Sequence, residues 1–399
     1  MDRKQATYRY ATSGGGTSEN KFSYLPGKKK KRKNRRFLLR ILAGIVVLAV
    51  ILLVVAFQVF SGRGRAGIGR VTKIAATITQ NITPFGDRIL FYDGTTIHCV
   101  LPSGANEWSY QIGTNADYDA AENKIVAWSG NELYILNSRG RLIYNNKMSD
   151  SIQFASAGKS YSAAFIGTAD KGVVTVIDGE GRVVDNIPVE SQTLLDIGFF
   201  EATAASSTQT TEYMWMMGLD TSGTVISTQL QTFQPGRLST GKTSLGDYIA
   251  YKIYDINGIL HIVTTREILH YTYRAVEDSS STLIYGYTLR DVRKIGNTVY
   301  QLLIPSLELS GGQTVSNVRL MYGNVNRMLH LPGKCISALL GQRCVYGFSQ
   351  DTVYACRFED TTFTAYPLDI PVTNVLGMIS ENRAVVASGS AIYIVELPL

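Results

Sequence analysis

The chain has 399 residues, which at roughly 150 residues per domain allows two or three domains or one large all-β domain. Hydrophobic residues make up 45% and charged residues 18% of the chain, a mixture that excludes a mainly disordered protein. The 37 Gly and 23 Tyr favour strands joined by tight turns, and the four Cys are too few for a small disulfide scaffold.

The net charge of +7 is concentrated at the N-terminus. Residues 1–36 carry 12 Lys and Arg against 2 acidic residues, whereas the other 363 residues carry 27 basic and 30 acidic side chains. We expect residues 1–36 to be a disordered basic tail. Because the rest of the chain has no basic excess, a folded nucleic-acid-binding domain is not expected.

Residues 37–60 form a 24-residue apolar stretch, broken by Arg40 near its start. At about 1.5 Å per residue, a helix of this length crosses a hydrocarbon core of ~30 Å. The 36 preceding residues are too many for an ordinary cleaved signal peptide, and no Cys follows that could carry a lipid. The sequence therefore predicts an uncleaved transmembrane anchor.

The side of the membrane follows from the charges next to this stretch. Eight Lys and Arg lie within residues 28–36, directly before it. The positive-inside rule places the N-terminus in the cytoplasm, with the tail on anionic lipid of the plasma membrane, and the C-terminal domain outside. Residues 61–70 are expected to be a flexible tether, and residues 71–399 an extracytoplasmic domain.

Residues 71–399 contain an internal repeat. Residues 122–136 and 381–395 align without a gap and are identical at seven of 15 positions, and residues 86–100 share their apolar frame. Each segment consists of an apolar run, a tight turn with Gly and a second apolar run, which is typical of a β-hairpin.

A second signature follows the hairpins. Gly104, Gly140, Gly181 and Gly223 each lie four residues after the end of an expected strand, at spacings of 36, 41 and 42. A period near 40 with four strands per unit predicts an all-β propeller of about eight four-stranded blades, with seven as the alternative and an antiparallel sandwich as the rival fold. The expected hairpins begin near Arg88, Lys124, Tyr161, Tyr213, Gly258, Thr298, Gln342 and Arg383.

The patterns Leu133–Asn137 with Gly140 and Ile97–Val100 with Gly104 and Trp108 resemble the quinoprotein-like and WD-like repeat propellers. The whole architecture resembles a bacterial family of uncharacterised single-pass proteins with an exported propeller. A quinoprotein dehydrogenase would imply a quinone cofactor and a calcium site. The axial catalytic and metal-ligand residues of those enzymes match no positions in this chain.

Two predictions concern strand pairing. The final hairpin ends at residue 397 and leaves no chain for a fourth strand of its blade, so we expect Val71–Thr79 to pair beside Ala391–Glu396 and close the ring. If the strands around Cys344 and Cys356 pair about Gln350, the two cysteines are directly opposite. They then form a disulfide or remain two thiols.

Gly236–Thr243 fits the phosphate-loop pattern G-x-x-x-x-G-K-[ST]. That motif requires a preceding strand and a following helix, but Pro235 precedes it and the residues after it have a strand pattern. We interpret the segment as a polar turn between two blades.

No other segment predicts a chemical site. His98 and His270 are expected at the hairpin position that Tyr134, Tyr354 and Tyr393 occupy, and no histidine pair has zinc-hydrolase spacing. Asp117, Asp119 and Glu122 are interpreted as solvated turn residues. We assign no catalytic, cofactor-binding or metal-binding residue and expect no cofactor.

Three functions are consistent with the sequence. The first is a non-enzymatic exported propeller that binds a protein or a cell-envelope polymer on loops of a rigid ring. The second is an enzyme acting on sugars or quinone-linked substrates in the central channel. The third is a signalling module whose propeller senses outside while residues 1–36 report inside. Carboxylates and histidines around the channel would favour the enzyme, and an exposed Tyr-rich face without such groups would favour binding.

Overall fold

The computed structural model describes residues 68–399 except 191, 205–207, 238, 311–313 and 399. Residues 66–399 form one compact unit. The predicted tail, the predicted anchor at residues 37–60 and residues 61–67 of the predicted tether lie outside the described residues. Within the described part of the chain, no helix is long and apolar enough to cross a membrane.

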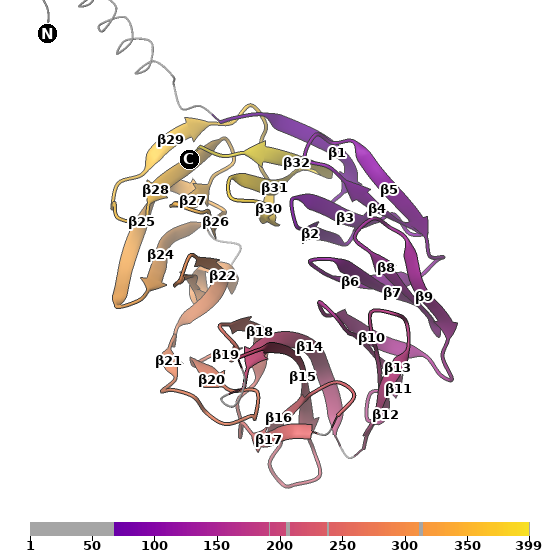
Figure 1. The fold of residues 1–399 in the computed structure, drawn as a ribbon. Helices are drawn as coiled ribbons and strands as arrows, with labels where there is room; N and C mark the ends of the chain where they lie inside the picture. Colours follow the sequence, from indigo (N-terminus) through magenta and orange to yellow (C-terminus); the bar gives the residue numbers. More distant parts are fainter. Residues whose placement is uncertain (1–67, 191, 205–207, 238, 311–313, 399) are drawn as a thin grey trace, which may run out of the picture. The chain divides into compact units, whose positions relative to one another are not determined.

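The described chain forms eight four-stranded antiparallel sheets arranged as the blades of a propeller (Figure 1). Blade 1 comprises β2–β5, blade 2 β6–β9, blade 3 β10–β13, blade 4 β14–β17, blade 5 β18–β21, blade 6 β22–β25 and blade 7 β26–β29, and blade 8 combines β30–β32 with β1. The prediction of an all-β propeller with eight blades is confirmed, and the seven-blade alternative is wrong.

In each blade the first strand is the innermost. The innermost strands are β2 (Ile82–Phe85), β6 (Ala116–Ala121), β10 (Ile152–Ala157), β14 (Thr193–Thr203), β18 (Ala250–Ile256), β22 (Tyr287–Ile295), β26 (Ser337–Leu340) and β30 (Asn374–Met378). The second strands are β3 (Arg88–Tyr92), β7 (Lys124–Ser129), β11 (Ser162–Thr168), β15 (Thr210–Asp220), β19 (Ile259–Thr264), β23 (Thr298–Pro305), β27 (Cys344–Phe348) and β31 (Arg383–Ser388).

The third strands are β4 (Thr96–Val100), β8 (Glu132–Asn137), β12 (Lys171–Ile177), β16 (Ser227–Phe233), β20 (Glu267–Tyr271), β24 (Val315–Tyr322), β28 (Thr352–Arg357) and β32 (Ala391–Glu396). The outermost strands are β5 (Asn106–Gln111), β9 (Leu142–Lys147), β13 (Val183–Val189), β17 (Ser239–Ser244), β21 (Thr282–Leu283), β25 (Val325–Cys335), β29 (Thr364–Pro367) and β1 (Val71–Thr77). One short helix, α2 (Ser306–Ser310), follows β23.

The middle strands of a blade are buried on both faces, because each blade packs between two neighbours. In blade 2, Ile125, Val126 and Ala127 are all fully buried. Ile125 packs with Leu90 of blade 1, whereas Val126 packs with Ala164 of blade 3. For this reason the middle strands of each repeat contain consecutive apolar residues and do not alternate between apolar and polar residues.

The ring closes through β1 and β32, as predicted. The two strands pair antiparallel from Val71 opposite Val395 to Thr77 opposite Ala391. Ile74 of β1 is 3% exposed and packs with Ile392 and with Phe91 of blade 1. β1 therefore serves as the fourth strand of blade 8, and it also forms part of the packing contact between blade 8 and blade 1.

The glycine signature has a packing cause. Gly140, in the turn between the third and fourth strands of blade 2, has φ +71°. A Cβ at this position would lie 2.5 Å from the ring of Trp108, which belongs to the outermost strand of blade 1. Glycine is required both by the backbone conformation and by this close approach. Gly104 and Gly181 occupy the corresponding turns of blades 1 and 3.

The fourth member of the predicted glycine series is wrong. Gly223 lies between the second and third strands of blade 4, and Gly236, with φ +71°, lies between the third and fourth strands. The error arose because the hairpin β14–β15 is 11 residues long on each side, which lengthens this repeat. In blade 5 the corresponding turn position is occupied by Ala275, with φ +52°.

The predicted pairing of Cys344 with Cys356 is wrong by one residue. Cys344 is opposite Arg357, and Cys356 is opposite Val345. Because side chains alternate between the faces of a strand, this shift places the two cysteines on opposite faces of blade 7. All four cysteines are free and buried, and burial raises the pKa of each thiol.

Removal of β1 tests the closure. A chain that begins at residue 82 should unfold about 10 °C below a chain that begins at residue 68, or should aggregate, since it loses about 5 kcal/mol of apolar burial and exposes the edge of β32. Thermal unfolding followed by circular dichroism measures the difference. Equal melting temperatures for the two chains would show that β1 does not close the ring.

Candidate functional site

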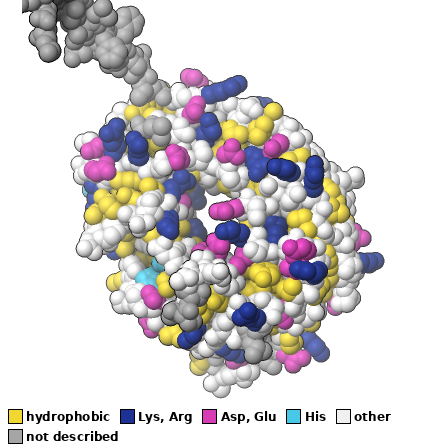
Figure 2. Space-filling view, in the orientation of Figure 1, with side chains coloured by type: hydrophobic (Ala, Val, Ile, Leu, Met, Phe, Trp, Pro, Cys, Tyr) yellow, Lys and Arg dark blue, Asp and Glu magenta, His cyan; other side chains and the backbone are white. Residues whose placement is uncertain are grey.

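The innermost strands surround a central channel, and their charged residues are segregated by sign. Acidic side chains come from β6 and β14, and β18 contributes both Lys252 and Asp255. Basic side chains prevail on β22, which carries Arg290, Arg293 and Lys294. The space-filling view shows an opening in the middle of the ring with acidic and basic side chains at its rim (Figure 2).

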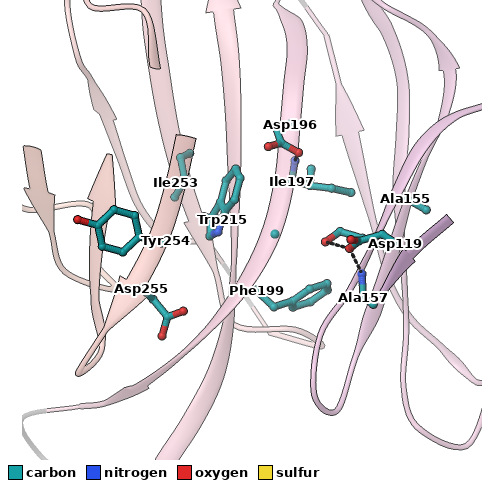
Figure 3. A pocket seen from close by; sticks show the side chains of 12 residues that line it. Asp119, Ala155, Ala157, Asp196, Ile197, Phe199, Trp215, Ile253, Tyr254 and Asp255 are labelled. Carbon is teal, nitrogen blue, oxygen red and sulfur yellow. Dashed lines mark hydrogen bonds between the residues drawn. The ribbon is translucent and has the colours of Figure 1, made fainter. Parts of the chain in front are cut away.

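A pocket of about 390 Å³ opens on the acidic part of this channel. Its walls come from the innermost strands of blades 2, 3, 4 and 5 and from Trp215 on β15, the second strand of blade 4. Three carboxylates, Asp119, Asp196 and Asp255, lie around it together with aromatic side chains of blades 4 and 5 (Figure 3). The aromatic residues are Phe199, Trp215 and Tyr254.

The first carboxylate corrects the sequence interpretation. Asp117 and Asp119 do not lie in turns but on β6, the innermost strand of blade 2; only Glu122 lies in a turn. Asp119 accepts hydrogen bonds from Ser156 Oγ at 3.0 Å and from the Ala157 amide at 2.9 Å, both on blade 3. The side chain therefore links two innermost strands at the edge of the pocket.

The other two carboxylates form no ion pair within the described residues, although the charge of Lys294 acts on Asp255 and opposes the rise of its pKa. Among the ion pairs of the described residues, none involves Asp196 or Asp255. Both residues are exposed towards the channel, but protein atoms of the surrounding strands take the place of part of the water around their carboxylates. This burial raises the pKa of Asp196, and the charge of Asp119 adds to the effect. Burial likewise raises the pKa of Asp255.

Trp215 reaches the pocket through a gap that Gly198 leaves. Gly198 on β14 is opposite Trp215 on β15, and a Cβ on Gly198 would lie 2.5 Å from the indole ring and 2.9 Å from Nε1. Trp215 is only 7% exposed. The indole N–H makes no hydrogen bond with any described residue, although most buried indole N–H groups find an acceptor.

In the basic part of the channel, charged side chains of β22 form hydrogen bonds with neighbouring blades. Arg290 donates to Val375 O at 2.8 Å and to Ser337 Oγ at 3.2 Å, which connects blade 6 to blades 8 and 7. Asp291 accepts a hydrogen bond from the Leu340 amide at 2.9 Å. These residues join blades, so they are less available to a ligand than the carboxylates of the pocket.

The histidines lie outside this pocket. His98 occupies the register position of Tyr134, as predicted, and forms a 2.7 Å contact with Asp93. The prediction for His270 is wrong, because Leu269 occupies that position and His270 is one residue further along β20. In the described part of the chain, no group of three or more His, Cys, Asp or Glu is arranged to hold a metal ion.

His261 supports the pocket from behind. Its ring stacks on Tyr254, with centroids 4.9 Å apart, and its Nδ1–H donates to Ile259 O at 3.1 Å. Burial lowers the pKa of His261 to about 4, and the nearby His270 contributes to the shift. His261 is therefore neutral in the folded protein at neutral pH.

The phosphate-loop pattern at Gly236–Thr243 has no phosphate-loop structure. Lys242 and Thr243 lie on β17 and pair with Gln231 and Leu230 of β16. No helix follows; the next element is β18. The prediction of a turn between two blades is wrong in detail. Gly236–Thr243 lies within blade 4, where it includes the turn after β16 and most of β17, the outermost strand.

Comparison with known proteins supports the fold. The WD40 domain of SCAP from fission yeast matches with a TM-score of 0.53 and 9% identity, over 83% of this chain and 98% of that chain. Saccharomyces cerevisiae Sqt1 matches with a TM-score of 0.52 and 8% identity, over 83% of this chain and 100% of that chain. BamB from Moraxella catarrhalis matches with a TM-score of 0.48 and 10% identity, over 82% of this chain and 98% of that chain.

The chain has a WD40-like β-propeller fold. At these identities the likeness shows the fold alone. No family model matches the sequence. No curated protein matches it either. The quinoprotein-like part of the predicted resemblance stays a prediction.

The gap at Gly198 can be tested by filling it. Gly198→Ala should lower the free energy of unfolding by about 1–3 kcal/mol, because the new Cβ overlaps the indole ring of Trp215. Gly377→Ala is the matched control, since Gly377 also lies on an innermost strand and its Cβ would meet nothing closer than 4.0 Å. Urea denaturation measures both; equal stabilities would contradict the close packing.

His261 predicts a pH dependence of stability. With a pKa near 4 in the folded state and about 6.5 in the unfolded state, the unfolded chain binds more protons between these values, so stability falls as the pH falls from 6.5 towards 4. At pH 5 the loss from this residue should be about 2 kcal/mol. Urea denaturation at pH 7 and pH 5 should show this loss in the wild type and a loss about 2 kcal/mol smaller in His261→Gln. An equal loss in both proteins would contradict the assignment.

Proposed function

We propose that the protein is a binding module: residues 37–60 anchor it in the plasma membrane of a bacterium, and the propeller outside the cytoplasm binds a protein partner. The pocket at Asp119, Asp196 and Asp255 carries the proposal, because it combines carboxylates that form no ion pair with a described residue and an indole N–H that has no acceptor among those residues. Groups left unpaired in a pocket gain hydrogen bonds and charge pairing when a ligand binds.

The anchor is supported by the sequence alone. The apolar length of residues 37–60 and the eight basic residues within 28–36 support a single span with the N-terminus in the cytoplasm. A rigid ring of blades then presents its channel and loops to molecules outside the cell membrane.

The enzymatic alternative has one supporting observation. A general acid for glycoside hydrolysis needs a raised pKa and a second carboxylate nearby, and Asp196 has a raised pKa in the same pocket as Asp119. Among the histidines, which the sequence analysis named as a second criterion for an enzyme, none lines the pocket. The signalling alternative depends on residues 1–36, outside the described chain.

Photocrosslinking in living cells tests the binding function. A photoreactive p-benzoylphenylalanine at position 199 faces the pocket, and the same residue at position 285, which is 74% exposed as Tyr285, is the control. We expect a discrete crosslinked partner from position 199 alone, and its loss when Asp196→Asn and Asp255→Asn are combined. Crosslinking that does not differ between the two positions would contradict a partner in the channel.

The membrane topology has its own test. Protease added to intact spheroplasts should digest residues 71–399 and leave residues 1–36 protected. Protection of the propeller instead would contradict the predicted orientation and, with it, an exported binding function.

A further inference from the structure

A second pocket, of about 500 Å³, lies between blades 4 and 5 and shares no residue with the channel pocket. Its lining comes mainly from β15, from the turn between β16 and β17, and from the turn between β20 and β21 (Figure 1). Two of the residues that line it, Arg237 and Arg274, are basic, and none of the described lining residues is acidic. The side chains that line this pocket therefore carry a positive charge.

The two turns are held against each other by backbone contacts. Thr240 Oγ1 on β17 donates a hydrogen bond to Tyr273 O at 2.7 Å. A Cβ on Gly241 would lie 1.9 Å from Arg274 O, so only glycine permits this approach. The backbone of Arg274 is therefore fixed against blade 4, next to the turn that carries Arg237. Gly241, part of the phosphate-loop pattern, serves this contact between blades.

The hydroxyl of Tyr213 lies close to both arginine charges. Tyr213 is 4% exposed and lines the pocket, and its hydroxyl makes no hydrogen bond with a described residue. The Tyr213 ring packs on Tyr273 with centroids 4.8 Å apart, and the Arg274 guanidinium group lies over the Tyr273 ring, 5.4 Å from its centroid. Burial raises the pKa of Tyr213, and the charges of Arg274 and Arg237 both oppose this rise. The two guanidinium groups therefore act on one hydroxyl.

Neither arginine is neutralised within the described chain. No ion pair of the described residues involves Arg237 or Arg274. A single exposed arginine is ordinary on a protein surface. Two arginines that line one pocket beside a buried hydroxyl donor are a different arrangement, because their like charges repel until an anion binds between them.

The donors of this pocket suit an anion with more than two oxygens. A carboxylate has two oxygens, and one guanidinium group can bind both. A terminal phosphate has three oxygens and a charge of about −1.5 to −2 at neutral pH, so it can accept hydrogen bonds from two guanidinium groups and a hydroxyl together. Gln234 and Thr211 add neutral side-chain donors.

We propose that this pocket binds a phosphate group carried by a larger molecule. Arg237 and Arg274 contact the phosphate oxygens, and the Tyr213 hydroxyl donates to one of them. The site is separate from the channel pocket, so it goes beyond the proposed binding function and does not depend on it. It also differs from a phosphate loop, because side chains hold the phosphate and Lys242 does not line the pocket.

Calorimetric titration of the full chain with glycerol 1-phosphate tests the proposal. We expect a dissociation constant on the order of 0.1 mM, and binding of acetate at least tenfold weaker. Residues 1–36 carry 12 Lys and Arg and attract anions on their own. The decisive quantity is therefore the difference in affinity between the wild type and single-residue variants of the pocket.

The variants are chosen to leave the fold intact. Arg237 and Arg274 are exposed, and Arg237→Gln and Arg274→Gln should each weaken binding at least tenfold, because each loses charge-assisted hydrogen bonds. Tyr213→Phe removes one neutral donor and should weaken binding about fivefold. Lys242→Gln is the matched control: Lys242 is exposed, belongs to the same segment and lies outside the pocket, so binding should not change. Equal melting temperatures would show that all four variants are folded.

Two ligands distinguish the sources of the phosphate. Glycerol 1-phosphate ends in a phosphomonoester, whereas dihexanoylphosphatidylglycerol is a soluble lipid whose headgroup contains a phosphodiester. Tighter binding of glycerol 1-phosphate would assign the pocket to the terminal phosphate of a soluble molecule or polymer. Tighter binding of the lipid, with the same loss in the arginine variants, would assign it to a membrane headgroup.

Three results would overturn the proposal. Equal affinity for acetate and glycerol 1-phosphate would exclude recognition of phosphate. Unchanged binding in both arginine variants would assign the measured binding to the basic tail. Loss of binding in Lys242→Gln, with the arginine variants unaffected, would point to a phosphate loop instead. None of these results bears on a partner in the channel, which the crosslink from position 199 tests separately.

Discussion

The burial of each blade between two neighbours is the constraint on which the rest of the structure depends. The second and third strands have no solvent-facing side, so apolar residues such as Ile125 and Val126 follow one another and contact different blades. A sheet of this kind is stable only when both faces are covered. The ring must therefore close, and the pairing of β1 with β32 completes blade 8 between blades 7 and 1.

The same packing frees the innermost strands for other tasks. Some of their side chains, such as Asp196 and Asp255, face the channel instead of a neighbouring blade, so these positions can carry charge. Arg290 and Asp291 use that charge to join blades 6, 7 and 8. Asp196 and Asp255 do not join blades, and partial desolvation by the surrounding strands raises the pKa of each carboxyl. Such an arrangement marks a candidate functional site more clearly than it explains stability.

Residues outside the innermost strands also shape the site. Gly198 on the innermost strand of blade 4 has no side chain, and the indole of Trp215 on the neighbouring strand fills the space that a Cβ at Gly198 would occupy and lines the pocket. His261 stacks behind Tyr254 in blade 5 in a comparable supporting position. The pocket is therefore built on strands that the rest of the ring holds rigid, which is a suitable basis for recognition.

The sequence by itself predicted the propeller, about eight blades and the closing strand, because local hairpin patterns recur with a period near 40. The structure decided for eight blades against the alternative of seven. It did not determine strand register, so the partners of Cys344 and the position of His270 were each wrong by one residue. It also did not reveal the pocket. Asp119, Asp196 and Asp255 are 77 and 59 residues apart, and each resembles a solvated polar residue until four blades bring the three carboxylates to one channel.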